Sequence, residues 1–118
     1  MTAIEKAKKA AAVLDEKKGK DVQILKVLEE TVITDYFVIA TATSSTHLKA
    51  LCDEVEYRLR EEDGVVSHHV EGYQGGGWIL VDFGDVIIHL FDANGREFFQ
   101  LEKLWSSAEK IDFEQKED

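Results

Sequence analysis

The chain has 118 residues, and 14 basic against 24 acidic side chains give it a formal net charge of −10 at pH 7. Its length suits one domain, and 44% hydrophobic with 32% charged residues is typical of a chain that buries a core. The apolar runs are too short for a membrane-spanning helix, the N-terminal segment does not resemble a signal peptide, and a single cysteine excludes an internal disulfide. We therefore expect a cytoplasmic protein whose charge repels nucleic-acid phosphates and favours a basic protein partner.

The N-terminal part of the sequence predicts a helix followed by a strand. Apolar residues recur at helical spacing along residues 2–18, and Thr2 is a suitable N-cap. The cations of Lys17–Lys18, followed by Gly19, are typical of a helix end because they lie at the negative end of the helix dipole. Residues 22–28 then predict a strand that ends in a polar turn.

A buried strand and a second helix follow. Residues 35–42 are mostly apolar and rich in strand-forming residues, which is typical of a central strand covered on both faces. The hydroxyl side chains of Ser44–Thr46 are suitable N-caps for a helix over about residues 45–62, which Gly64 ends. Cys52 lies beside the apolar stripe of this helix, so we expect an inert core thiol.

The C-terminal half contains the clearest strand signals. A short strand is predicted over residues 65–70, and a flexible glycine-rich loop over residues 72–77. Two strongly apolar segments, residues 77–83 and 86–91, then predict a pair of strands. Residues 92–95, with the sequence Asp-Ala-Asn-Gly, predict a turn.

The last part of the sequence predicts a closing helix and a tail. The helix is indicated by four bulky residues, Phe98, Leu101, Leu104 and Trp105. From about residue 107 the chain is acidic and only sparsely apolar, so we expect a frayed segment. We therefore divide the sequence into a domain over residues 1–106 and an acidic tail over residues 107–118. The order of elements predicts a single small α/β domain, in which helices flank a mixed sheet in the α+β manner.

A hairpin fixes which side chains share a face of this sheet. Gly84 and Asp85 lie between the two apolar strands and are typical of a two-residue turn. If they form the turn, Phe83 lies opposite Val86, and side chains alternate between the two faces along each strand. One face then collects only apolar residues and is predicted to be core: Ile79, Val81, Phe83, Val86, Ile88 and Leu90.

The other face of the hairpin is mixed. It collects Trp78, Leu80, Asp82, Ile87, His89 and Phe91. A carboxylate and an imidazole are costly to bury unless they are paired, and exposed aromatic residues with a polar edge are typical of protein-binding surfaces. The pattern therefore predicts a face that meets water or a partner. The alternative is a covering helix, beneath which Asp82 pairs with His89.

No pattern in the sequence predicts catalysis. Two carboxylates that share a metal on one strand need even spacing, whereas Asp82 and Asp85 are three residues apart. The adjacent His68 and His69 would point to opposite faces of a strand, and the loop at residues 72–77 lacks the lysine of a phosphate-binding loop. We expect no catalytic site, no metal and no cofactor.

Two long blocks of residues identify a family. The pattern W-x-L-x-D-x-G-D-V-x-x-H-x-F spans residues 78–91, and R-E-x-x-x-L-E-x-L-W spans residues 96–105. Further matching positions are Asp35–Ala40, Ser44, Lys49–Ala50 and Glu71–Gly72. Together they resemble the ribosomal silencing factor family, also called Iojap-related proteins, over roughly residues 3–106 of this chain.

The resemblance implies a nucleotidyltransferase-like fold without a catalytic role. It implies that the protein binds protein fourteen of the large ribosomal subunit, blocks docking of the small subunit and lowers translation when nutrients are short. It also implies a homodimer when the protein is free. The family's binding surface corresponds here to five residues, Trp78, Leu80, Asp82, His89 and Phe91.

The sequence departs from the family pattern at two aromatic positions, and two rival hypotheses remain. Phe83 and Phe99 stand where many relatives carry tyrosine, so this chain lacks both hydroxyls. One rival is a nucleotidyltransferase that uses Asp82, Asp85 and the Ser44 region with Mg²⁺. The other is a homodimer formed through the mixed sheet face, in competition with ribosome binding.

Overall fold

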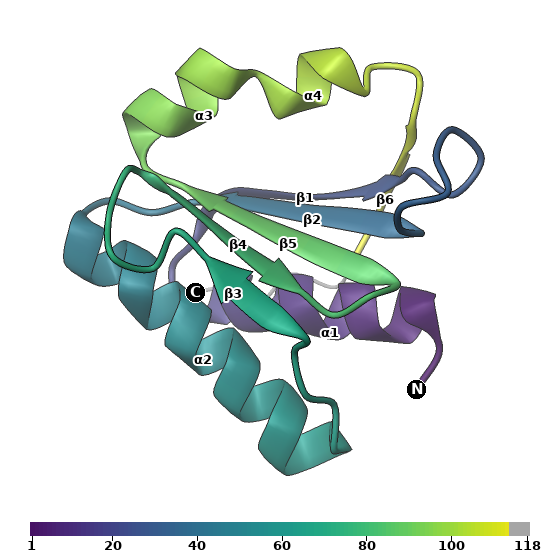
Figure 1. The fold of residues 1–118 in the computed structure, drawn as a ribbon, viewed down its shortest axis with the longest axis horizontal. Helices are drawn as coiled ribbons and strands as arrows, with labels where there is room; N and C mark the ends of the chain where they lie inside the picture. Colours follow the sequence, from purple (N-terminus) through teal and green to yellow (C-terminus); the bar gives the residue numbers. More distant parts are fainter. Residues whose placement is uncertain (114–118) are drawn as a thin grey trace.

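The computed structural model describes residues 1–113 as a six-stranded mixed sheet with helices on both faces (Figure 1). Its elements are α1 (Ala3–Glu16), β1 (Lys20–Lys26), β2 (Tyr36–Thr41), α2 (Ser45–Asp63), β3 (His69–Glu71), β4 (Trp78–Asp82), β5 (Val86–Phe91), α3 (Ala93–Phe99), α4 (Leu101–Leu104) and β6 (Glu109–Ile111). The strand order is β3-β4-β5-β2-β1-β6, with β2 parallel to β5 and the other neighbours antiparallel. This arrangement confirms the predicted α/β class.

Two helical layers enclose the sheet. The helices α1 and α2 pack on one face, whereas α3 and α4 lie over the other (Figure 1). The larger hydrophobic core lies beneath α1 and α2, and a smaller second core lies beneath α3 and α4. Within residues 1–113, no helix combines the length and the apolar character needed to cross a membrane.

The helix caps confirm the local signals of the sequence. Thr2 caps α1, because its hydroxyl accepts a hydrogen bond from the backbone N–H of Glu5, whose carboxylate accepts one from the N–H of Thr2. Ser44 caps α2 through the N–H of His47, and Gly64 ends that helix with a φ of 67°. These contacts satisfy backbone groups that a helix end leaves unpaired.

The end of α1 departs slightly from the prediction. The helix stops at Glu16, and Lys18 rather than Gly19 takes the left-handed conformation, with a φ of 70°. Gly19 is required for a different reason, since a Cβ atom there would lie 2.9 Å from the carbonyl oxygen of Leu14. The glycine therefore allows a close approach of the chain to the helix end.

The strand β2 is central and buried, as predicted. It lies between β1 and β5, and each of its residues except Thr41 is buried. On α2, Cys52 belongs to the same core. Burial raises the pKa of the Cys52 thiol to about 12, so the sulfur stays protonated. The prediction of a core thiol is confirmed by this position.

The predicted turn at residues 92–95 is wrong, because these residues begin a helix. The carboxylate of Asp92 accepts a hydrogen bond of 2.7 Å from the backbone N–H of Gly95 and so caps α3. The single predicted closing helix is divided into α3 and α4 at Gln100, which has a φ of 47°. An Asp followed three residues later by Gly suits both a turn and a helix cap, so the sequence alone does not separate them.

Two strand boundaries also differ from the prediction. The strand expected over residues 65–70 is limited to His69–Glu71. The segment expected to fray from about residue 107 includes Glu109–Ile111, which pairs with β1 at the edge of the sheet. The remainder of the predicted tail, residues 114–118, lies outside the described residues, and the division of the chain at residue 106 stays a prediction.

Candidate partner-binding surface

The hairpin between β4 and β5 has the predicted register. Trp78 pairs with Phe91, and Asp82 pairs with Ile87, as the two-residue turn requires. The turn is closed by a 2.9 Å hydrogen bond from the N–H of Phe83 to the carbonyl oxygen of Val86. All six residues of the predicted core face are buried beneath α1 and α2: Ile79, Val81, Phe83, Val86, Ile88 and Leu90.

The opposite face is divided between a covered half and an open half. On β5, Phe91 is 0% exposed and His89 is 5% exposed, because α3 and α4 lie over β5 and β2. The expectation that these two side chains face outward is therefore wrong. On β4, which lies nearer the sheet edge, Trp78, Leu80 and Asp82 are half-buried and reach the surface.

Trp78 is held firmly although part of it is exposed. Its indole Nε1–H donates a hydrogen bond of 3.1 Å to Nδ1 of His89. Its ring stacks on Phe91, with 5.4 Å between ring centroids, and lies 4.5 Å from the ring of Phe99. The indole is therefore fixed from beneath and from the α3 side, and its remaining surface is available for contact.

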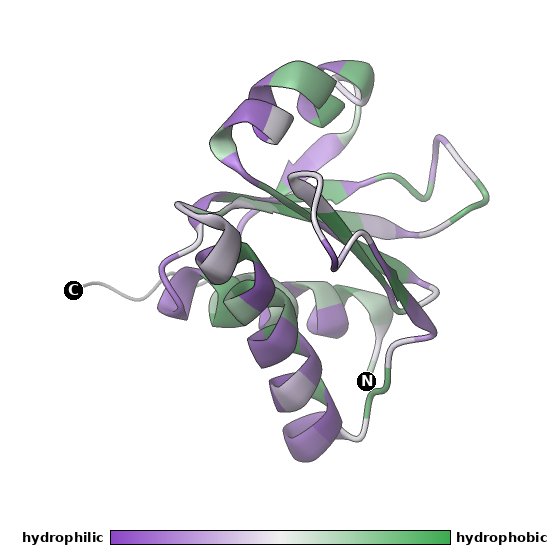
Figure 2. Ribbon diagram, turned by 60° about the vertical axis from the view of Figure 1, so that its left-hand side comes forward, coloured by the Kyte–Doolittle hydropathy of each residue, from purple (hydrophilic) through white to green (hydrophobic). Residues whose placement is uncertain are grey.

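The apolar surface continues from Trp78 onto α3 and α4. Phe98 packs edge-on against Phe99, with 5.0 Å between centroids, and Phe98 is 80% exposed. Leu104 on α4 is 75% exposed and lines a shallow hollow together with both phenylalanines. Figure 2 shows apolar segments on these outer helices. We call Trp78, Leu80, Phe98, Phe99 and Leu104 the apolar ridge.

The sequence-based prediction did not include the α3–α4 part of this ridge, because it used the bulky residues there only as signs of a closing helix. The signal that could have found it is the adjacent pair Phe98 and Phe99. Successive residues of an α-helix project about 100° apart, so two neighbouring rings do not both pack on one sheet. In the structure Phe99 contacts Trp78 and Phe91, and Phe98 points to solvent.

Asp82 supports the hairpin from the open half of the face. Its Oδ1 accepts a 2.7 Å hydrogen bond from the N–H of Gly84, and its Oδ2 lies 3.6 Å from Nδ1 of His69. Gly84 itself has a φ of 88°, as its place in the turn requires. The alternative pairing of Asp82 with His89 is not found, since His89 bonds to Trp78 instead. Contact between Asp82 and a partner stays a prediction.

The residues of the rival metal-dependent enzyme are not brought together. Asp85, immediately before β5, forms a 2.6 Å ion pair with Lys6 of α1. Ser44 follows the far end of β2, which runs parallel to β5, so it lies at the opposite end of the sheet from Asp85. Among residues 1–113, no cluster of three or more His, Cys, Asp and Glu side chains is arranged to hold a metal ion.

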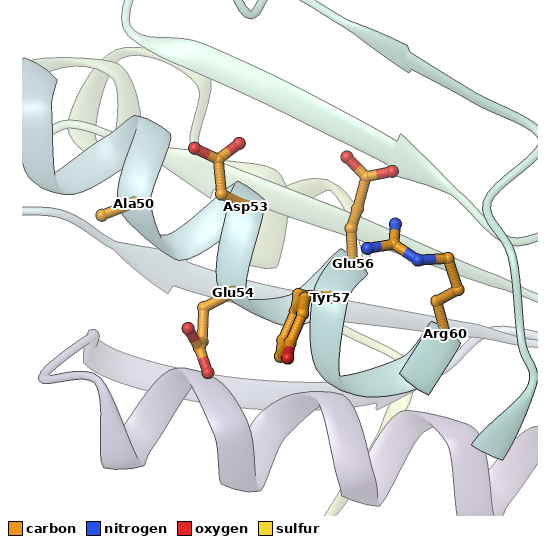
Figure 3. Close-up of a pocket in the computed structure, with 6 residues that line it drawn as sticks. All are labelled: Ala50, Asp53, Glu54, Glu56, Tyr57 and Arg60. Carbon is orange, nitrogen blue, oxygen red and sulfur yellow. The ribbon is translucent and has the colours of Figure 1, made fainter. Parts of the chain in front are cut away.

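A hollow on the outer surface of α2 is lined mainly by charged side chains (Figure 3). Its carboxylates are already engaged, since Glu56 accepts a hydrogen bond from Ser67 and Asp53 accepts one from Tyr73. Figure 3 shows Glu54 on the other side of the helix, toward α1. We therefore assign no ligand to this hollow.

Comparison with known proteins decides the family. The model of the family described as "Ribosomal silencing factor during starvation" matches residues 1–118. The chain belongs to the ribosomal silencing factor family. This match confirms the resemblance seen in the two sequence blocks. It also assigns the chain to a family that acts in ribosome silencing and translation regulation.

Individual relatives of this silencing-factor chain are similar over most of its length. The ribosomal silencing factor RsfS of Bacillus subtilis is 34% identical over 105 residues, which are 89% of this chain and 88% of that protein. A mouse protein named mitochondrial assembly of ribosomal large subunit protein 1 is 35% identical over 102 residues, which are 80% of this chain and 42% of that protein.

Solved structures agree with the fold. A crystal structure of a Chromobacterium violaceum protein is similar with a TM-score of 0.85 and 34% identity, covering 96% of this chain and 92% of that one. A crystal structure from Bacillus halodurans is similar with a TM-score of 0.74 and 29% identity, covering 93% of this chain and 96% of that one. This chain thus shares its arrangement of sheet and helices with both solved structures.

Proposed function

We propose that this protein binds the large ribosomal subunit through protein fourteen of that subunit, in the cytoplasm. Once bound, it occupies a surface that the small subunit needs for docking. The two subunits then fail to associate, and translation falls when nutrients are short. The protein acts by steric exclusion and carries out no chemical reaction.

The observation that carries this proposal is the half-buried indole of Trp78, which reaches the surface within the apolar ridge. Interfaces commonly place an aromatic anchor near their centre, surrounded by contacts that exclude water. Leu80 lies beside Trp78 on β4, and Phe99 supports it from α3. A contiguous apolar surface of this kind on a highly charged chain favours a protein partner.

The charge of the chain supports the same choice of partner. A net charge of −10 attracts a basic ribosomal protein over distances comparable to the screening length and repels ribosomal RNA. Asp82 lies on the same strand as Trp78 and Leu80, so a carboxylate borders the ridge. Charge complementarity of this kind mainly accelerates encounter and sets orientation.

A rigid ridge suits a blocking role. Arg96 of α3 is only 11% exposed, and it donates hydrogen bonds to Oγ1 of Thr41 at 2.7 Å and to the carbonyl oxygen of Asp21 at 2.9 Å. It also pairs with Glu102 of α4 at 2.8 Å. These contacts fasten α3 and α4 to the sheet, so the phenylalanines keep their place beside Trp78.

The test is sucrose-gradient sedimentation of purified subunits. Large subunits preincubated with the protein and then mixed with small subunits should stay separate, and the protein should migrate with the large subunit. Large subunits without the protein should form complete ribosomes under the same conditions. Full subunit association at saturating protein would contradict the proposal, as would migration of the protein with the small subunit.

The homodimer is a related proposal about the free protein. A second copy that used the apolar ridge would cover the surface needed for the ribosome, so dimer formation and ribosome binding would compete. Covalent crosslinking of the dimer should then abolish migration with the large subunit. Unchanged ribosome binding by the crosslinked dimer would show that the two copies meet elsewhere.

A further inference from the structure

His89 is buried, and its side chain has no evident role at the protein surface. It lies on the same sheet face as Trp78, but its side chain is covered by the second core. We propose that His89 is a positioning residue, which holds the indole of Trp78 in its binding orientation through a hydrogen bond to Nδ1. This inference rests on the proposed function, because it concerns how the anchor of the ridge is presented.

The sheet register brings the two side chains together. Trp78 pairs with Phe91 and Leu80 pairs with His89, so Trp78 and His89 are diagonal neighbours on one face. Diagonal neighbours in an antiparallel pair are within reach of long side chains. The ring centroids of Trp78 and His89 are 5.8 Å apart, and Nε1 of the indole lies 3.1 Å from Nδ1 of the imidazole.

The imidazole is confined by other aromatic rings. Phe37 of β2 meets it edge-on, with 4.7 Å between centroids, and Phe91 lies nearly parallel to it at 6.3 Å. These rings fix the plane of the imidazole and therefore the direction of its Nδ1 lone pair. An indole N–H that bonds to this lone pair has one preferred orientation.

The protonation state suits an acceptor at Nδ1. Burial lowers the pKa of His89 to about 4, so the ring is neutral near pH 7. A neutral imidazole has one acceptor nitrogen and one N–H. Because Nδ1 accepts from Trp78, the proton lies on Nε2, which is buried and has no hydrogen-bond partner within residues 1–113.

This placement argues against direct contact between His89 and a partner. The side chain is 5% exposed and its acceptor nitrogen is already occupied by the indole. Any effect of His89 on binding is therefore expected to pass through Trp78. A residue that only fills the core would instead act on stability alone, and the two roles can be separated.

A matched pair of variants separates them. His89→Leu fills the site with an apolar side chain and removes the acceptor. His89→Asn retains an acceptor oxygen close to the position of Nδ1. Both variants are compared with the wild-type protein by co-sedimentation with purified large subunits, and the indole N–H resonance of Trp78 is followed by ¹H–¹⁵N NMR. The indole of Trp105 serves as an internal reference.

We expect His89→Leu to bind large subunits about 2- to 12-fold more weakly, the range of a typical net hydrogen-bond contribution. The Trp78 indole proton should also exchange faster with solvent, while that of Trp105 is unchanged. His89→Asn should restore both the affinity and the slow exchange. Full binding by a folded His89→Leu variant, or slow Trp78 exchange in it, would overturn the positioning role.

Two further measurements keep the result unambiguous. If His89→Asn does not fold, the ¹⁵N chemical shifts of the imidazole in the wild-type protein decide. An unprotonated Nδ1 supports the proposal, and a protonated Nδ1 overturns it.

Trp78→Ala distinguishes failure of this inference from failure of the proposed function. Unchanged binding by Trp78→Ala contradicts the anchor itself, whereas weak binding by Trp78→Ala with full binding by His89→Leu contradicts only the positioning role.

Discussion

The two strands of one hairpin present the same face of the sheet in two different environments. On β5, Phe91 and His89 are sealed beneath α3 and α4, whereas on β4, one strand nearer the edge, Trp78 and Leu80 reach the surface. Alternation along a strand decides to which face a side chain points. What covers that face is decided by elements elsewhere in the chain.

The position of α3 explains the difference. Asp92 caps α3 immediately after β5 ends, so the chain turns back over β5 and β2 instead of over β4. Leu101 of α4 belongs to the second core, and Trp105 packs edge-on against Phe37 with 5.3 Å between centroids. Both helices are thereby held above the centre of the sheet. The indole of Trp78, in the open half, therefore stays only half-buried.

The largest expected effect comes from the covered half. Phe91→Ala removes a fully buried ring from the second core, so the free energy of unfolding should fall by about 3–5 kcal/mol. Urea denaturation followed by circular dichroism measures the loss. A change below about 1 kcal/mol would mean that α3 and α4 do not seal this half of the face.

The covered half should also respond to pH. The pKa of His89 is lowered by burial from its ordinary value of 6.5 to about 4. Between these pH values His89 binds a proton in the unfolded chain but not in the folded chain. The free energy of unfolding should therefore fall as the pH drops from about 6.5 toward 4. The free energy of unfolding should change by on the order of 3 kcal/mol across this pH range.

Denaturant titrations at a series of pH values test this, with His89→Leu as the control. The variant should lose this part of the pH dependence while keeping the contributions of the other titrating groups. Parallel pH profiles for wild type and variant would show that the imidazole is not sealed from water in the folded protein.

A smaller effect is expected at the connection between the covering helices and the sheet. Arg96→Met keeps the aliphatic stem but removes the hydrogen bonds to Thr41, Asp21 and Glu102. We expect a loss of about 1–3 kcal/mol in the free energy of unfolding, measured by denaturation. Hydrogen exchange should accelerate in α3 and α4 more than in β2. Uniform acceleration across the sheet would contradict a local fastening role.

The smallest effect is expected at the outer end of the apolar ridge. Phe98 is 80% exposed, so Phe98→Ser should change the free energy of unfolding by no more than about 0.5 kcal/mol. Binding to large subunits should weaken by about 1 kcal/mol, or roughly fivefold, since an outer contact contributes less than a central anchor. Co-sedimentation measures the change, and unaltered affinity would place Phe98 outside the interface.

Local signals in the sequence were sufficient to predict much of the fold. The two-residue turn at Gly84 and Asp85 fixes the hairpin register, and Ser44 with Gly64 marks the ends of α2. Each of these depends on residues close together in the chain. The apolar run of β2 likewise predicts a buried strand without reference to its neighbours.

Tertiary placement was not predictable in the same way. The burial of Phe91 depends on where α3 lies, and the strand Glu109–Ile111 exists because the edge of β1 offers backbone groups to pair with. Neither the burial of Phe91 nor the pairing of Glu109–Ile111 produces a periodic pattern in the sequence of that segment. The partner-binding face itself stays a prediction. Two of its five predicted residues, His89 and Phe91, are buried, and the exposed apolar surface continues onto Phe98 and Phe99, which the prediction did not include.

The most direct test of the central claim compares two aromatic residues that reach the surface on opposite sides of the molecule. Trp78→Ala removes the proposed anchor, and Tyr57→Ala removes a ring that is 54% exposed on α2. With both variants folded, titration against purified large subunits should show at least about tenfold weaker binding for Trp78→Ala and wild-type affinity for Tyr57→Ala. Wild-type affinity of Trp78→Ala, or an equal loss in both variants, would contradict the account.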